Sequence, residues 1–183
     1  MKPLKAIFFK DFESTHIPEQ LDEMYLKSIY KPYLEGKKDL TLLDVGGNIG
    51  LWSMCAYPFA KNIYCIEPSQ QHQDALKTML EYNKFTDKVT PIQVALSATN
   101  GTASFYHSPN VTAFSLRKEL NFIPGETEDV RTVTFDTLFK ELNLDHVDLC
   151  KMDVEGSEYD IFVSEGFDRV KDKIDIIVGE FHT

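Results

Sequence analysis

The sequence predicts an α/β fold with a doubly wound parallel sheet whose strands have the order 3-2-1-4-5. From residue 40 onward, short apolar segments alternate with segments of helical spacing, as in β-α-β units. A glycine-rich turn, Gly46 to Gly50, separates the first predicted strand from its helix. Pro91 lies in the third predicted strand, and proline is tolerated on an edge strand far better than in a central one. Since the third strand is an edge in the order 3-2-1-4-5, Pro91 favours this order.

Each element of this pattern has its own signal in the sequence. Apolar runs predict strands at residues 40–45, 62–66, 89–96, 147–152 and 174–179. The first helix is expected at residues 49–56. Ser69 and Asp136 are each placed to cap a helix, and Ser157 with Asp160 has the spacing of a capping box. Strands and helices therefore alternate along most of the chain.

Two segments depart from this alternation. Residues 17–35 carry apolar side chains at helical spacing, interrupted near Pro32. They predict an N-terminal helical extension over residues 1–36, ahead of an α/β domain at residues 37–183. Residues 101–131 contain short β-like segments around a polar loop, and we expect them to be an insertion in that domain. Both segments are natural walls for a substrate pocket.

The composition excludes several classes of function. Of the 183 residues, 29 are Asp or Glu and 19 are Lys or Arg, so the net charge of −10 argues against nucleic acid as a partner. No apolar run approaches the roughly 18 residues of a membrane span and no signal-peptide pattern is present, so we expect a cytoplasmic protein without a membrane partner. Cys55, Cys65 and Cys150 lie in apolar stretches without metal-site spacing. We expect them to be buried reduced thiols, and neither they nor the histidines show the pattern of a zinc site.

A carboxylate stands close to the glycine turn in the predicted fold. Glu67 lies 20 residues beyond Gly47, at the carboxyl end of the strand next to the turn. An acid in this position accepts hydrogen bonds from the ribose hydroxyls of a nucleoside cofactor, while the turn contacts the rest of the cofactor. The sequence therefore predicts a nucleoside-cofactor site at this edge of the sheet.

Two classes of cofactor compete for this site. NAD enzymes have the spacing G-x-G-x-x-G, of which Gly47 and Gly50 supply the last two glycines but Val45 replaces the first. S-adenosylmethionine enzymes have an acid separated by one residue from the first glycine, as Asp44 is from Gly46. Such an acid suits an ammonium and a sulfonium better than a pyrophosphate. S-adenosylmethionine is therefore favoured, and a NAD-linked oxidoreductase is the less favoured alternative.

The sequence resembles the FkbM-type S-adenosylmethionine-dependent methyltransferases over about residues 40–182. The motifs that carry the resemblance are LDVGGNIGLWS, IYCIEPS, VTPIQVALSATNGTASFY, VRTVTFDTL, VDLCKMDVEGSEYDIF and IIVGEFH. The resemblance implies a Rossmann-like class I methyltransferase fold. It also implies an enzyme that transfers a methyl group from S-adenosyl-L-methionine, usually to a hydroxyl of a sugar, polyketide or similar small metabolite.

The resemblance also implies which residues hold the cofactor. Those expected to line its methionine part are Asp44, Gly46, Gly47 and Asn48. Glu67 would hold the ribose, and Ala95 would lie against the adenine. Asp153, just past the fourth predicted strand, would face the methionine end of the cofactor and the substrate.

Candidates for activating the acceptor follow the fourth and fifth predicted strands, which end in Asp153-Val154-Glu155 and Glu180-Phe181-His182. In one reading Asp153, Glu155 or His182 is a general base that takes the hydroxyl proton. In a second reading these oxygens hold a hard divalent ion that lowers the pKa of the acceptor. In a third, Glu155 only favours a helix N-terminus, Glu180 is a buried hydrogen-bond acceptor and His182 lies in solvent.

The end of the chain departs from the family pattern. The family's fold continues after the fifth strand with a helix and an antiparallel strand pair, whereas this sequence stops at Thr183. We therefore expect the terminal strands to be missing and the fifth strand to be an open edge, at which a homodimer could form. The alternative to an active enzyme is a cofactor-binding module or a truncated, inactive methyltransferase subunit.

Overall fold

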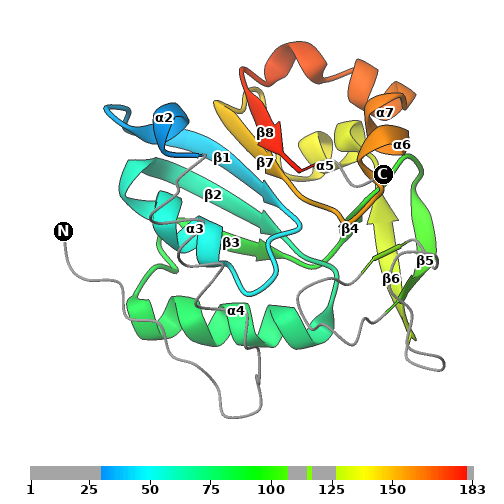
Figure 1. Ribbon diagram of the computed structural model, residues 1–183, viewed down its shortest axis with the longest axis horizontal. Coiled ribbons are helices and arrows are strands. Elements are labelled where there is room, and N and C mark those ends of the chain that lie inside the picture. Colours follow the sequence, from blue (N-terminus) through cyan, green and yellow to red (C-terminus); the bar gives the residue numbers. More distant parts are fainter. Residues whose placement is uncertain (1–29, 107–114, 117–126, 181–183) are drawn as a thin grey trace.

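Within residues 30–106, 115–116 and 127–180, which are those that the computed structural model describes, five parallel strands form the central sheet (Figure 1). In spatial order they are β3 (Val89–Ile92), β2 (Ala60–Ile66), β1 (Leu40–Val45), β7 (Leu149–Met152) and β8 (Ile177–Gly179). Each neighbouring pair is parallel. This confirms the order 3-2-1-4-5, and it places Pro91 on an edge strand as predicted.

Helices cover both faces of this sheet (Figure 1). The helical elements are α2 (Lys31–Leu34), α3 (Leu51–Ala56), the 3-10 turn η2 (Tyr57–Phe59), α4 (Gln70–Asn83), α5 (Phe135–Glu141), α6 (Glu158–Phe162), α7 (Glu165–Asp168) and the 3-10 turn η3 (Lys171–Lys173). Leu42 belongs to the core cluster that includes side chains of α3 and α4, and Leu43 to the cluster that includes α5 and α6. Successive side chains of a strand point to opposite faces, so β1 separates two apolar cores.

A second sheet lies beside the first, in the order β4-β6-β5. Its strands are β4 (Ala95–Leu96), β6 (Thr127–Val133) and β5 (Gly101–Tyr106). The single strand predicted at residues 89–96 is therefore wrong. The backbone N–H of Val94 donates to the carbonyl of Ile92 instead of continuing the ladder with β2, and Ala95 and Leu96 then pair with β6. The described part of the predicted insertion, 101–131, contains β5 and most of β6, which pair antiparallel.

The helix caps agree with the sequence at one position of three. Ser69 caps α4, since its side chain accepts a hydrogen bond from the backbone N–H of His72. Asp136 does not cap α5: the N-cap is Thr134, and Asp136 lies in the first turn with its Oδ1 accepting from Thr134 Oγ1 at 2.6 Å. Asp136 lies two residues after the N-cap, which explains the error.

The predicted capping box at the start of α6 is also wrong. Ser157 is the N-cap residue, but its backbone is helical (φ −92°, ψ 0°) and its side chain makes no capping hydrogen bond within the described part of the chain. The carboxylate of Glu158 instead accepts from the backbone N–H groups of Val154 and Gly156. Hydrogen bonds to Glu158, the first residue of α6, therefore hold the turn before this helix.

Most of the predicted N-terminal extension lies outside the described residues. Of that segment, the structure describes α2, which has Pro32 in its first turn. Proline is tolerated there because a backbone N–H in the first turn has no partner within the helix. The ring of Tyr30 packs edge-on against Trp52 of α3, with 5.8 Å between ring centroids. In the ranges that the structure describes, none of the helices has the length and apolar character that crossing a membrane requires.

Truncating Phe135 tests the core on the α5 side of the sheet. Phe135 is completely buried, and its ring centroid lies 5.3 Å from that of Phe167 in α7. Phe135→Ala is expected to lower the free energy of unfolding by about 3–5 kcal/mol in urea denaturation, because it leaves a cavity between helix and sheet. The exposed Tyr159 is the control, and Tyr159→Ala should change stability by no more than about 0.5 kcal/mol. Equal losses in the two variants would contradict this packing.

Candidate functional site

The turn between β1 and α3 requires glycine at two positions. Gly46 has φ +70°, and a Cβ there would lie 1.6 Å from the carbonyl oxygen of Asp153. Gly50 has φ +82°, and a Cβ there would lie 2.2 Å from Cδ1 of Leu76 in α4. Both positions combine a left-handed backbone with close contact, which only glycine accommodates. The turn therefore brings the ends of β1 and β7 together.

The carboxylate of Glu67 is bonded to this turn. The backbone N–H groups of Gly46 and Gly47 donate to the carbonyl of Ile66, the last residue of β2. The next residue, Glu67, accepts a hydrogen bond at Oε2 from the backbone N–H of Asn48, at 2.9 Å. Asn48 has φ +50°, a left-handed conformation that asparagine adopts more readily than most residues. The predicted pairing of the glycine turn with an acid at the end of the next strand is thus present as a direct contact.

His72 is a second side chain at this carboxylate. It lies in the first turn of α4, is buried, and places Nδ1 3.1 Å from Glu67 Oε1. The same oxygen accepts a hydrogen bond from the backbone N–H of Ser69 at 3.0 Å. Sequence reasoning did not identify His72. The signal available was its position three residues after a helix cap, next to the predicted ribose acid.

A buried lysine joins the ends of β1 and β7. Lys151 lies opposite Asp44 in the register of these strands. Its Nζ lies 3.6 Å from Asp44 Oδ1 and 3.7 Å from Asp153 Oδ2, and it donates a hydrogen bond of 2.8 Å to the carbonyl of Gly46. Burial lowers the pKa of Lys151, but the two carboxylates outweigh burial and raise the pKa above its usual value. Lys151 is therefore a permanent cation, and the sequence analysis missed it inside an apolar strand.

Asp44 lies near the end of β1, two residues before Gly46. It is completely buried, and its Oδ2 accepts a hydrogen bond of 2.6 Å from Ser53 Oγ. It is not part of the cavity wall, where Lys151 stands in its place. That Asp44 lines the methionine part of a cofactor stays a prediction; in the structure Asp44 is paired with Lys151 and accepts a hydrogen bond from Ser53 of α3.

A cavity opens at the carboxyl ends of β1, β2 and β7. Its wall includes the other predicted cofactor residues, which are Gly46, Gly47, Asn48, Glu67, Ala95 and Asp153. Apolar side chains supply much of the remaining wall, among them Trp52, Ile66, Val94, Leu96 and Phe105. The structure thus brings together residues that are up to 107 positions apart in the sequence (Gly46 to Asp153).

Two of the predicted catalytic groups, Asp153 and Glu155, line this cavity. Glu155 has φ +53°, and its carbonyl accepts a hydrogen bond of 2.6 Å from Ser115 Oγ. Glu180 is exposed at the end of β8, so the reading of Glu180 as a buried acceptor is wrong. His182 lies outside the described residues. Among the residues that the structure describes, these carboxylates form no metal-binding group, which leaves the divalent-ion reading without support here.

Burial keeps one tyrosine and two cysteines near the site neutral. Burial, opposed by Lys151 and reinforced by Asp153, raises the pKa of Tyr30 to about 12. Burial also raises the pKa of Cys150 to about 12 and that of Cys65 well above its usual value. Both cysteines are buried free thiols, as predicted, while Cys55 is half-buried. Tyr30, Cys65 and Cys150 therefore add no charge to the site.

One family model matches most of the chain, and two curated relatives are named as methyltransferases. Residues 44–183 match the model of the family described as Methyltransferase FkbM domain. Hexuronic acid methyltransferase AglP of Haloferax volcanii is 26% identical over 149 residues, covering 81% of this chain and 58% of that protein. Methyltransferase sdnD of Sordaria araneosa is 30% identical over 151 residues, covering 66% of this chain and 58% of that protein. The alignments thus cover a little over half the length of each of these relatives.

Solved structures similar to this chain include two proteins at low sequence identity. Precorrin 8w decarboxylase of Methanobacterium thermoautotrophicum has a TM-score of 0.48 and 14% identity, covering 81% of this chain and 57% of that chain. The C-terminal domain of precorrin-6Y C5,15-methyltransferase from Rhodobacter capsulatus has a TM-score of 0.47 and 12% identity, covering 84% of this chain and 59% of that chain.

Removing the buried cation should destabilise the protein. Lys151→Met leaves Asp44 and Asp153 without their counter-charge, so the free energy of unfolding is expected to fall by about 3–5 kcal/mol in urea denaturation. Adding Asp44→Asn should recover part of that loss, as a double-mutant cycle would measure. Lys77→Met, on the exposed side of α4, is the control. If Lys151→Met were as stable as this control, the ion-pair network would not hold the turn.

Proposed function

Because the chain belongs to the FkbM methyltransferase family, we propose that it binds S-adenosylmethionine and methylates a hydroxyl oxygen of a small molecule. The first acceptors to test are hexuronic acids and their glycosides, since one relative is named as a hexuronic acid methyltransferase. The observation that carries the proposal is the contact of Glu67 with the backbone of Asn48 at the cavity wall.

Glu67 is suited to a ribose hydroxyl. A carboxylate offers about four lone-pair directions. Ser69 and His72 face Oε1, whereas Asn48 faces Oε2. One direction at Oε2 is left for a ligand, so Glu67 would accept a hydrogen bond from one ribose hydroxyl while the protein fixes its orientation. This differs from the expectation that Glu67 accepts from both hydroxyls.

The charge of the cavity favours S-adenosylmethionine over NAD. The carboxylates of Glu67, Asp153 and Glu155 line it together with the ammonium of Lys151. An excess of negative charge stabilises a sulfonium and an ammonium and repels a pyrophosphate. The apolar side chains of Val94 and Leu96, which also line the cavity, offer a surface for adenine. The residues present therefore fit the methyl donor.

Asp153 and Glu155 would have separate roles, one toward the cofactor and the other toward the acceptor. When bound, S-adenosylmethionine supplies the methyl group. Asp153, held by Lys151, would face the positive end of the cofactor. Glu155 would take the hydroxyl proton of the acceptor as general base. Its left-handed backbone supports this assignment, because strained conformations of residues other than glycine cluster at functional sites.

Calorimetric titration with S-adenosylhomocysteine tests the cofactor site. Glu67→Gln keeps the shape of the side chain but removes its charge, and we expect binding to weaken about 10- to 100-fold, since hydrogen bonds to a charged acceptor are worth roughly 1.5–3 kcal/mol. Glu81→Gln, an exposed position on α4, should bind like the wild type. Binding of NAD in place of S-adenosylhomocysteine would contradict the proposal, and binding of neither would favour an inactive module.

Methyl transfer to hexuronic acids, followed by mass spectrometry of the product, tests the base. Glu155→Gln is expected to reduce kcat about 100- to 10,000-fold, the usual contribution of general base catalysis. Its affinity for S-adenosylhomocysteine should remain that of the wild type. Glu81→Gln again serves as the control. Full activity of Glu155→Gln would exclude Glu155 as the base and leave Asp153 or His182.

A further inference from the structure

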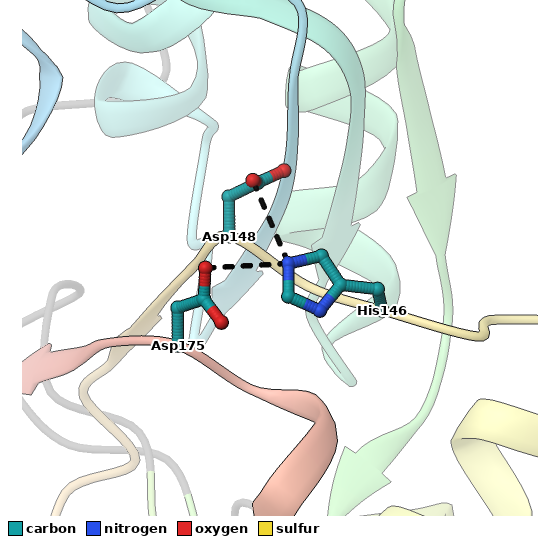
Figure 2. A group of neighbouring side chains, drawn as sticks. All are labelled: His146, Asp148 and Asp175. Atoms are coloured by element: carbon teal, nitrogen blue, oxygen red, sulfur yellow. Dashed lines mark ion pairs between the residues drawn. The ribbon is translucent and has the colours of Figure 1, made fainter.

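His146, Asp148 and Asp175 come together in space (Figure 2). They lie at the end of the sheet that is opposite the cavity. They precede β7 and β8, so they lie where these strands begin, whereas the cavity lies where the strands end. His146 Nε2 faces both carboxylates, at 3.6 Å from Asp148 Oδ1 and 3.3 Å from Asp175 Oδ2. The nitrogen and the carboxylate oxygens all lie within 4.8 Å of one another.

The backbone fixes this arrangement. His146 and Asp148 lie on either side of Val147, and their side chains are turned toward each other (Figure 2). Val147, between them, pairs with Ile174 in a parallel bridge. The next residue, Asp175, donates its backbone N–H to the carbonyl of Val147 at 3.0 Å. Asp175 is therefore held beside the other two side chains by main-chain pairing, and not by a chance contact of surface residues.

Asp148 is also oriented by β1. Its Oδ2 accepts a hydrogen bond of 2.7 Å from the backbone N–H of Thr41, and its own backbone N–H donates to the carbonyl of Thr41 at 2.9 Å. With one carboxylate oxygen bonded to Thr41, the other is turned toward His146. Outer hydrogen bonds of this kind orient the ligands of metal sites.

The two distances from His146 to the carboxylates agree with the spacing of ligand atoms in a metal centre. In a tetrahedral zinc site with bonds of about 2.1 Å, neighbouring ligand atoms lie about 3.4 Å apart. The distances of 3.3 and 3.6 Å from His146 Nε2 lie on either side of that value. We propose that His146, Asp148 and Asp175 form a binding site for a first-row divalent cation of the Zn²⁺ type. An imidazole combined with carboxylates is a donor set that such ions accept.

A protonated His146 paired with the two aspartates is the competing explanation. Its distances to them exceed the usual 2.9 Å of a hydrogen bond, and exposed ion pairs contribute little to stability. The side chains of His146 and Asp175 are 49% and 60% exposed, so an ion could enter and water could complete its coordination. The bound ion would connect β7 and β8 and, through Asp148 and Thr41, β1. Its role would be structural, because the cavity lies at the other edge.

Calorimetric titration of the metal-free, untagged protein with ZnCl₂ tests this site. The wild type should bind at this site and gain thermal stability, as linkage requires of a ligand that binds the folded state. His146→Gln and Asp175→Asn should each weaken binding by more than about tenfold and abolish the gain in melting temperature. Asp145→Asn, an exposed carboxylate next to the site, should bind like the wild type. Mg²⁺ should bind far more weakly, because it prefers oxygen ligands alone.

Two results would overturn the proposal. If the wild type binds no Zn²⁺, the cluster is an ion-pair group only. If both variants retain wild-type affinity, the ion is bound by other histidines or cysteines. Melting temperatures measured in chelator, and binding of S-adenosylhomocysteine, show whether each variant is folded. Since the cluster is remote from the cavity, both properties should stay close to those of the wild type, whether or not the proposed methyl transfer is correct.

Discussion

The ammonium of Lys151 is the interaction on which the rest of the site depends. It lies between the carboxylates of Asp44 and Asp153 and bonds the carbonyl of Gly46, so a single buried charge ties the ends of β1 and β7 to the glycine turn. Removing ions from water is expensive unless they are paired and hydrogen-bonded. The turn therefore has little freedom to shift, and Asn48, two residues further on, is presented to Glu67 at a fixed distance.

The fold was predictable where its signals are local. Apolar periodicity marks the strands, and Pro91, which cannot donate to a ladder, marks an edge. The break after Ile92 was not predictable, because it depends on which neighbouring strand takes the hydrogen bonds of residues 95–96. Ser157 has the right spacing for a capping box but the wrong backbone conformation, which the sequence does not specify. Local pattern thus predicts elements better than their partners.

The same distinction applies to the site. The glycines and Glu67 were identified because a nucleoside cofactor needs glycine where it approaches the backbone and an acid for its ribose, at a fixed spacing in the sequence. Lys151 was missed because one lysine in an apolar strand gains its meaning only from Asp44, which stands opposite it more than 100 residues earlier in the chain. His72 was missed for a similar reason, since a histidine on an apolar helix face commonly belongs to the core. Such roles arise from tertiary pairing.

The register of β7 links the metal-site cluster at the amino ends of the strands to the cavity at their carboxyl ends. A slip of one residue would turn every side chain of a strand to the opposite face and would take Lys151 away from Asp44. The register is fixed at the amino end of β7 by the two hydrogen bonds between Asp148 and Thr41. At the carboxyl end, this register places Lys151 opposite Asp44, so that the two side chains pair. An ion held by Asp148 would therefore add to the bonds that fix the register at the amino end of β7, without contacting the cavity.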